Sequence, residues 1–209
     1  QEWAAGSGHF DIAKSSLTCP DKQQAILKPL MDQFTQDLAS SGIAGTEKNP
    51  ATIVFAIKSA DRKENPEQYT LAIKPNHIEA TAPTTTGLFY ASQSLLQLAM
   101  QSPKIPCGTL VDHPDYRKRA LMLDVGRKFF PYETLKDYIR TMGFLKMNEL
   151  HLHISDNSVG KEIYPGFRIE CDTLPELTNK DGFYTKTQIR ELQDFARLLG
   201  ITIVPEIDA

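Results

Sequence analysis

The first half of the chain alternates helix-like and strand-like hydrophobic patterns. Residues 21–39 carry an apolar side chain at every fourth position (Ile26, Leu30, Phe34, Leu38), which predicts an amphipathic helix. Short β-branched runs predict strands, and a second apolar stripe preceded by threonines predicts another helix. The predicted strands cover 51–57, 69–73 and 77–82, and the second helix covers 85–101. These elements form a three-strand, two-helix module that is large enough to bury its own core.

The second half follows the order strand, helix, strand, helix, strand. Ala120–Val125 is almost continuously apolar, as expected for a strand covered on both faces. Pro131 marks the start of the first helix, and a capping box of Thr185 and Gln188 marks the start of the second. The other two predicted strands are Glu149–Ile154 and Ile201–Val204. This order predicts a parallel sheet, in either a doubly wound fold or a (β/α)8 barrel.

Three prolines, Pro103, Pro106 and Pro114, separate the two patterns. We therefore expect a small α+β domain over residues 1–113 and an α/β domain over residues 114–209. A complete (β/α)8 barrel takes ~250 residues, so the second domain is expected to hold only the first three βα units of a barrel. The chain ends directly after the third predicted strand, and we expect the barrel to be truncated there.

Composition excludes several classes of protein. The 209 residues carry a net charge of −3, with 41% hydrophobic and 23% charged residues. This balance gives no general attraction to nucleic acid, and no apolar run approaches the ~18–20 residues of a membrane-spanning helix. The three cysteines form no C-x-x-C motif and cannot make a four-cysteine zinc site. The first residue is Gln1 rather than Met, which suggests that an initiator region or a signal peptide was removed by processing or cloning. Removal of a signal peptide predicts export to the periplasm, the cell surface or the medium.

Polar residues follow all three predicted strands of the second half. Arg127 comes shortly after the first strand, Asp156 after the second, and Glu206 and Asp208 after the third. The carboxyl ends of parallel strands face one crevice, so we expect these four side chains to converge. Carboxylates at successive strand ends favour a functional site over a solvated surface.

His151 and His153 form an H-x-H pair on the second strand of this half, and alternation places both rings on one face. Such a pair at a strand end is a metal-ligand pattern of metal-dependent amidohydrolase barrels. That pattern belongs on the first strand of those barrels, whereas here it lies on the second. Histidines bonded to carboxylates or to the backbone are the alternative interpretation.

Several motifs, in order and correctly spaced, resemble glycoside hydrolase family 20, the β-N-acetylhexosaminidases. The strand motifs are residues 121–130 (LMLDVGRKFF), residues 147–156 (MNELHLHISD) and residues 204–208 (VPEID). Tyr184-Thr185-Lys186 is similar to the start of the family's following helix, and Gly87–Ala91 with Val111–Pro114 is similar to its small domain before the barrel. The resemblance covers about residues 45–209.

The resemblance implies roles for individual positions. Arg127 matches an arginine that hydrogen-bonds the hydroxyls of the terminal sugar, a task that suits the fixed fork of a guanidinium. Asp156, His153, Asp208 and Glu206 are expected to support the active site, and Asp124 to be structural. The partner would be a glycan ending in an N-acetylhexosamine, and no cofactor or metal is expected. Asn157–Gly160 departs from the family's usual acidic and aromatic residues, which affects the outer subsite.

In the family, an adjacent Asp-Glu pair on the fourth strand supplies the general acid and orients the substrate's acetamido group, whose carbonyl oxygen is the nucleophile. That pair is expected downstream of Ala209. The expected function is therefore that of a fragment of an exo-β-N-acetylhexosaminidase, inactive on its own. Two alternatives stay open: a metal-dependent hydrolase that uses His151 and His153, and a non-catalytic carbohydrate-binding or interaction module.

Overall fold

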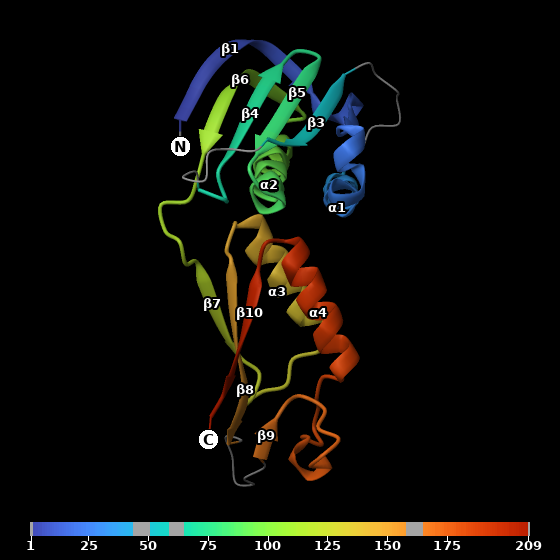
Figure 1. The fold of residues 1–209 in the computed structure, drawn as a ribbon, viewed down its shortest axis with the longest axis vertical. Coiled ribbons are helices and arrows are strands. Elements are labelled where there is room, and N and C mark those ends of the chain that lie inside the picture. Colours follow the sequence, from blue (N-terminus) through green and yellow to red (C-terminus); the bar gives the residue numbers. More distant parts are fainter. Residues whose placement is uncertain (1, 44–50, 59–64, 158–164, 209) are drawn as a thin grey trace. The chain divides into compact units, whose positions relative to one another are not determined.

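Two units make up the chain, Gln1–Arg117 and Lys118–Ala209 (Figure 1). The computed structural model describes residues 2–43, 51–58, 65–157 and 165–208. Residues 158–160, which belong to the departure from the family pattern noted above, lie outside the described part. The mixed α/β fold class predicted from the sequence is confirmed.

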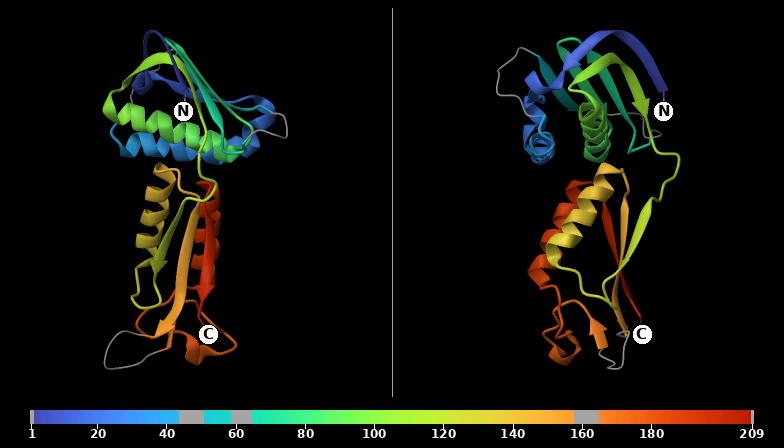
Figure 2. Two further views of the ribbon diagram at one scale, coloured as in Figure 1. Left: turned by 90° about the vertical axis from the view of Figure 1, so that its left-hand side faces the viewer. Right: turned by 180° about the vertical axis from the view of Figure 1, so that it is seen from behind.

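The Gln1–Arg117 unit is a six-stranded sheet with two helices on one of its faces (Figures 1 and 2). The sheet order is β1-β6-β4-β5-β3-β2. The strands are β1 (Glu2–Asp11), β2 (Ser16–Thr18), β3 (Thr52–Ile57), β4 (Tyr69–Lys74), β5 (His77–Ala82) and β6 (Lys104–Asp112). The helices are α1 (Gln24–Ser40) and α2 (Thr85–Gln101). Aromatic side chains dominate the largest fully buried positions of this unit.

Helix α2 occupies the predicted range because its signals are local. The Thr84 hydroxyl accepts a hydrogen bond from the Gly87 amide at 3.1 Å, which caps the first turn. A Cβ atom on Gly87 would lie 2.5 Å from the Gln68 carbonyl oxygen, so a glycine allows the helix to approach the sheet closely. Leu88 and Leu95 are fully buried, as the apolar stripe predicts.

The prediction of three strands in this unit is wrong, because β1, β2 and β6 were missed. Strand β1 is almost entirely exposed and therefore lacks an alternating pattern. Pro106, interpreted above as a boundary marker, lies inside β6 opposite His9, next to an irregularity in the β1–β6 pairing. Ile26 is also exposed, since Leu27 faces the core together with Leu30 and Phe34.

The Lys118–Ala209 unit is a parallel three-stranded sheet in the order β10-β8-β7, with a short strand beside β8. Its elements are β7 (Ala120–Asp124), α3 (Tyr132–Phe144), β8 (Glu149–Asn157), β9 (Pro165–Phe167), α4 (Lys186–Leu198) and β10 (Thr202–Ile207). Figure 2 shows α3 and α4 on the same side of this sheet. A capping box of Thr185 and Gln188 starts α4, as the sequence predicts.

The sequence predicted that the strand at Ala120–Val125 is covered on both faces, but one face of this sheet carries exposed side chains. Met122 is 55% exposed, and Val204 at the same level of β10 is 37% exposed. Leu150 and Leu152 of β8 are buried, and successive side chains of a strand point to opposite faces. Met122 and Val204 lie at the level between these two leucines, so both point away from α3 and α4. Within the described residues of this unit, helices cover only one face.

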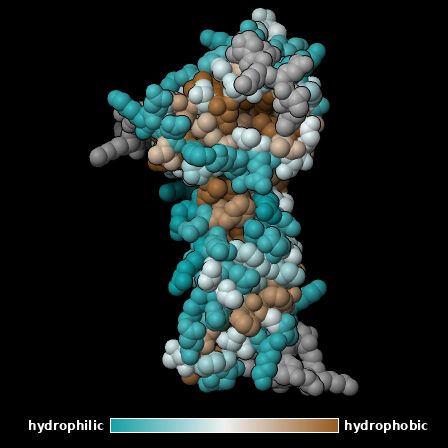
Figure 3. Space-filling model, turned by 90° about the vertical axis from the view of Figure 1, so that its right-hand side faces the viewer, coloured by the Kyte–Doolittle hydropathy of each residue, from teal (hydrophilic) through white to brown (hydrophobic). Residues whose placement is uncertain are grey.

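Polar side chains cover much of the face drawn in Figure 3, where apolar areas appear in both units. Scattered exposed apolar residues are normal on protein surfaces. Among the described residues, no helix combines the length and apolar character needed to cross a lipid bilayer.

Candidate functional site

Three titratable side chains lie at one level across the parallel sheet of the second unit. Asp124 of β7 pairs in register with His153 of β8, and His153 pairs with Glu206 of β10. Residues that pair in register on neighbouring strands point to the same face of the sheet. The strand pairing therefore brings together side chains that are up to 82 positions apart in the sequence.

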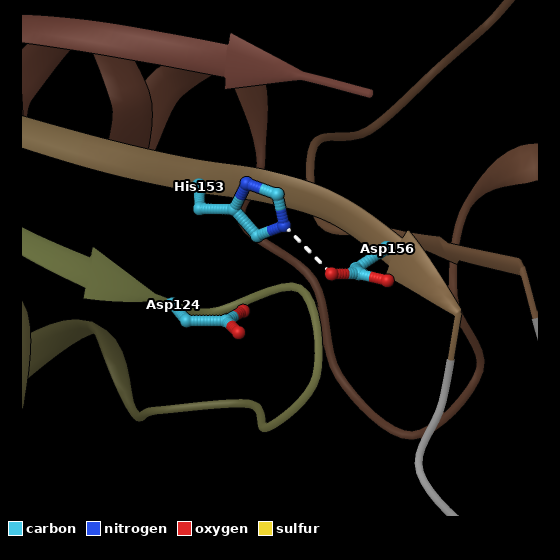
Figure 4. Close-up of side chains that lie close together, drawn as sticks. All are labelled: Asp124, His153 and Asp156. Atoms are coloured by element: carbon cyan, nitrogen blue, oxygen red, sulfur yellow. Dashed lines mark hydrogen bonds and ion pairs between the residues drawn. The ribbon is translucent and has the colours of Figure 1, made fainter. Parts of the chain in front are cut away.

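His153 contacts two carboxylates, those of Glu206 and Asp156, and Figure 4 shows its hydrogen bond to Asp156. Its Nδ1 atom lies 2.7 Å from Glu206 Oε2, and its Nε2 atom lies 2.9 Å from Asp156 Oδ2. A neutral imidazole donates from only one nitrogen, so both contacts are hydrogen bonds to carboxylates when the ring is an imidazolium. The hydrogen bond to Asp156 raises the pKa of His153, with a further contribution from Glu206, although burial opposes the shift. His153 is 6% exposed.

Glu206 joins the two histidines of the H-x-H motif. Its Oε2 atom lies 2.9 Å from His151 Nε2 as well as 2.7 Å from His153 Nδ1. The hydrogen bond from His153 is the main cause that lowers the pKa of Glu206. A carboxylate with two histidine partners is held ionised, since both donors favour its charged form.

Arg127 follows β7 in a turn and reaches the same cluster. Its Nη2 atom lies 2.7 Å from Asp156 Oδ2, and its Nη1 atom lies 3.4 Å from Asp124 Oδ2. The side chain is 55% exposed, whereas that of Asp156 is only 14% exposed. Two carboxylates thus orient a guanidinium that is still accessible to a ligand.

Two hydrogen bonds between its backbone and the Ser155 side chain hold Asp208 beside the cluster. The Asp208 amide donates to Ser155 Oγ at 2.9 Å, and Ser155 Oγ donates to the Asp208 carbonyl oxygen at 3.3 Å. The Asp208 carboxylate lies within 4.8 Å of ligand atoms of His153 and Glu206. The structure thus brings together all five residues that the sequence analysis selected: Arg127, His153, Asp156, Glu206 and Asp208.

Metal-ligating atoms cluster in two overlapping groups among the described residues. One group is Asp124, His153 and Asp156, and the other is His153, Glu206 and Asp208. His151 belongs to neither, so the H-x-H pair is not itself a cluster of this kind. Hydrogen bonds to carboxylates account for both ring nitrogens of His153, which matches the alternative interpretation of these histidines.

The sequence analysis missed Arg168, which lies directly beneath the turn that carries Arg127. Its side chain is 1% exposed and donates to the carbonyl oxygens of Val125 at 2.7 Å and Gly126 at 3.0 Å. An isolated arginine in a loop gives no sequence signal for burial, because arginines are mostly exposed. Gly166 and Gly182, on either side of Arg168 in the sequence, lie in close contact with neighbouring segments.

Family models cover both units. The model "Glycosyl hydrolase family 20, domain 2" matches residues 1–113, and the model "Glycosyl hydrolase family 20, catalytic domain" matches residues 116–209. The sequence resemblance stated above is therefore confirmed.

Individual relatives agree with these models. A beta-hexosaminidase of Akkermansia muciniphila is 34% identical over an alignment of 157 positions, which covers 68% of this chain and 31% of that protein. A beta-N-acetylhexosaminidase of Cellulomonas fimi is 30% identical over an alignment of 177 positions, which covers 78% of this chain and 34% of that protein. The structure of a GH20 beta-N-acetylhexosaminidase from Streptomyces coelicolor superposes with a TM-score of 0.81 at 26% identity, over 100% of this chain and 45% of that chain.

The chain spans about a third of the length of these curated relatives. The domain 2 model and the catalytic domain model match consecutive parts of this one chain. The chain belongs to glycosyl hydrolase family 20.

Proposed function

We propose that the protein containing these 209 residues is an exo-β-N-acetylhexosaminidase that releases terminal β-linked N-acetylhexosamines from glycans. The observation that carries this proposal is the exposed guanidinium of Arg127, which Asp156 and Asp124 orient at the carboxyl ends of the parallel strands. Active sites of (β/α)8 enzymes lie at this end of the sheet. The relatives named beta-hexosaminidase support the same chemistry.

Arg127 would bind the hydroxyls of the terminal sugar. Its planar fork of donors can hold two neighbouring oxygens at once, and the ion pair with Asp156 fixes the direction of that fork. Such a site discriminates against a sugar that lacks one of these hydroxyls, because the bound sugar displaces water from the guanidinium and leaves one of its donors without a partner.

His153 and Glu206 would hold Asp156 in place and set the charge of the site. With His153 as an imidazolium, the arginine and histidine charges offset the charges of Asp156 and Glu206. We propose that residues beyond Ala209 supply the general acid and the residue that orients the acetamido group. In such a mechanism the substrate's own carbonyl oxygen attacks the anomeric carbon.

The test is hydrolysis of p-nitrophenyl N-acetyl-β-glucosaminide and N-acetyl-β-galactosaminide by the full-length protein. Release of nitrophenol, with no release from p-nitrophenyl β-glucoside, would support the proposal, because the glucoside lacks the acetamido nucleophile. Absence of turnover on both acetamido substrates would overturn it. The non-catalytic carbohydrate-binding module would then become the better hypothesis.

The isolated 209-residue chain, assayed in parallel, is expected to be inactive. Strong turnover by that chain would contradict the assignment of the general acid to residues beyond Ala209. Export of the protein stays a prediction, and cell fractionation followed by the same activity assay tests it.

A further inference from the structure

The largest of the fully buried side chains is a charged one, Arg168. Burying a guanidinium without partners is very costly, so its contacts show what the fold uses it for. Arg168 follows β9 directly, and its backbone amide donates to the Ile154 carbonyl oxygen of β8 at 3.0 Å. The side chain thus starts from a fixed point on the sheet.

The guanidinium joins two segments that are distant in sequence. Its Nε and Nη2 atoms donate to the carbonyl oxygens of Val125 and Gly126. Its Nη1 atom donates to the Gly182 carbonyl oxygen at 2.9 Å and to the Asp181 carboxylate. A planar group with several donors in fixed directions can satisfy all of these acceptors at once, which a single ammonium cannot do.

An aromatic ring and a glycine complete this arrangement. The guanidinium carbon lies 5.8 Å from the centre of the Phe129 ring, within the range of a cation–π contact. A Cβ atom on Gly182 would lie 2.4 Å from the same ring, so the loop can approach the ring only with a glycine. The position of the guanidinium is therefore tightly determined.

The hydrogen bond to Gly126 acts on the peptide group that leads into Arg127. The Gly126 carbonyl and the Arg127 amide belong to one planar unit. Arg168 holds the oxygen of this unit at 3.0 Å, and Asp124 Oδ1 accepts from its amide at 3.0 Å. Fixing a peptide plane at both ends fixes the direction in which the next side chain leaves the backbone.

The rest of the turn is fixed in the same way. The amides of Val125 and Gly126 both donate to the His153 carbonyl oxygen at 3.0 Å. With Arg168 as the donor to both carbonyl oxygens, the backbone polar groups of Val125 and Gly126 are all bonded. The base of Arg127 is thus held by groups other than its own ion pairs.

We propose that Arg168 is a positioning residue for Arg127, and that it sets the orientation of the sugar-binding guanidinium through the Gly126–Arg127 peptide. This inference rests on the proposed function. Arg168 does not touch the substrate, and its effect on hydrolysis passes through Arg127. A purely structural role would lower stability without depending on which side chain stands at position 127.

The test is a double-mutant cycle in the full-length enzyme, with kcat/KM for p-nitrophenyl N-acetyl-β-glucosaminide as the readout. Arg168→Lys is expected to lower kcat/KM by about tenfold or more when Arg127 is present, and by less than about twofold in the Arg127→Ala background. A positioning residue loses its effect once the group that it positions has been removed.

Arg119→Lys is the matched control. Arg119 stands just before β7, and its Nε atom donates to the Lys146 carbonyl oxygen at 2.6 Å, but the bond lies at the opposite end of the strand. We expect its substitution to change kcat/KM by less than about twofold in both backgrounds. If Arg168→Lys does not fold, Asp181→Asn replaces it, because Asp181 is a 65% exposed partner of the same guanidinium.

Equal fold losses with and without Arg127 would overturn the inference, and so would a lower Tm with unchanged kcat/KM. A wild-type enzyme that hydrolyses neither acetamido substrate would overturn the proposed function and this inference together. That result appears before any substitution is made, so the two failures are distinguishable.

Discussion

Arg127 and His153 share a single oxygen of Asp156: Arg127 Nη2 lies 2.7 Å and His153 Nε2 lies 2.9 Å from Oδ2. Glu206 Oε2 likewise contacts both His153 and His151. The contacts therefore form a continuous series of alternating basic and acidic groups across three parallel strands. Changing one member alters the charge and the orientation of its neighbours, because each carboxylate is shared.

Replacement of Arg127 tests its assignment to the substrate. In the full-length enzyme, Arg127→Ala is expected to lower kcat/KM by about 10- to 100-fold, in line with the loss of charged hydrogen bonds. Steady-state kinetics on the chromogenic N-acetylglucosaminide measure this loss. Arg140→Ala is the control, since Arg140 pairs with Asp137 on the surface of α3. An unchanged kcat/KM for Arg127→Ala would show that another residue binds the sugar.

His153 is expected to make the stability of the protein depend on pH. Its pKa is raised above the ordinary 6.5, so its stabilising contribution is complete below pH 6.5 and is lost as the pH rises through the raised value. The lowered pKa of Glu206 gives the opposite dependence: its contribution is present above the ordinary 4.5 and is lost as the pH falls through the lowered value. The cluster is therefore most stabilising between these two ordinary values.

Thermal denaturation across pH 5 to 9 measures this effect. The difference in Tm between the wild type and His153→Gln is expected to be largest at the acid end and to shrink above pH 6.5. His113→Gln, which removes an exposed histidine of the other unit, controls for the loss of a histidine as such. A difference in Tm that does not change with pH would contradict the imidazolium form of His153.

Gly166 is expected to tolerate no side chain. A Cβ atom there would lie 2.5 Å from the Asp156 carbonyl oxygen and 2.9 Å from the Gly126 carbonyl oxygen, and neither backbone group can yield without moving the site. Gly166→Ala should lower the free energy of unfolding by about 1–3 kcal/mol, measured by urea denaturation. Gly126→Ala should cost less, because its nearest contact would be 3.1 Å. The reverse order would show that β9 is not packed in this way.

Thr185 caps the helix α4 through its bond to the Gln188 amide at 3.1 Å, and Gln188 returns a bond to the Thr185 amide. Thr185→Ala is expected to destabilise the protein by about 1 kcal/mol, because the Gln188 amide in the first turn of the helix loses its acceptor, Thr185 Oγ1. Thr187→Ala, at an exposed position of the same helix, is expected to be neutral or slightly stabilising. Equal losses for both variants in urea denaturation would contradict the capping role.

The sequence analysis located the elements whose signals are local. Helix α2 and strand β5 have the predicted bounds, since a cap and a regular apolar period are read within a few neighbouring residues. Strands β1 and β6 escaped prediction because they pair with each other across about a hundred positions. Because β1 is almost entirely exposed and β6 contains a proline, neither strand shows the regular apolar alternation that predicts a strand.

For the candidate site, the order of elements in the sequence was enough to predict that Arg127, Asp156, Glu206 and Asp208 meet at one edge, because parallel strands align their carboxyl ends. Only the tertiary structure decided which atoms they share and that Arg168 lies buried beneath the turn. Periodicity and caps are properties of neighbouring residues, whereas a shared carboxylate oxygen or a buried guanidinium depends on strand register and on packing between distant segments.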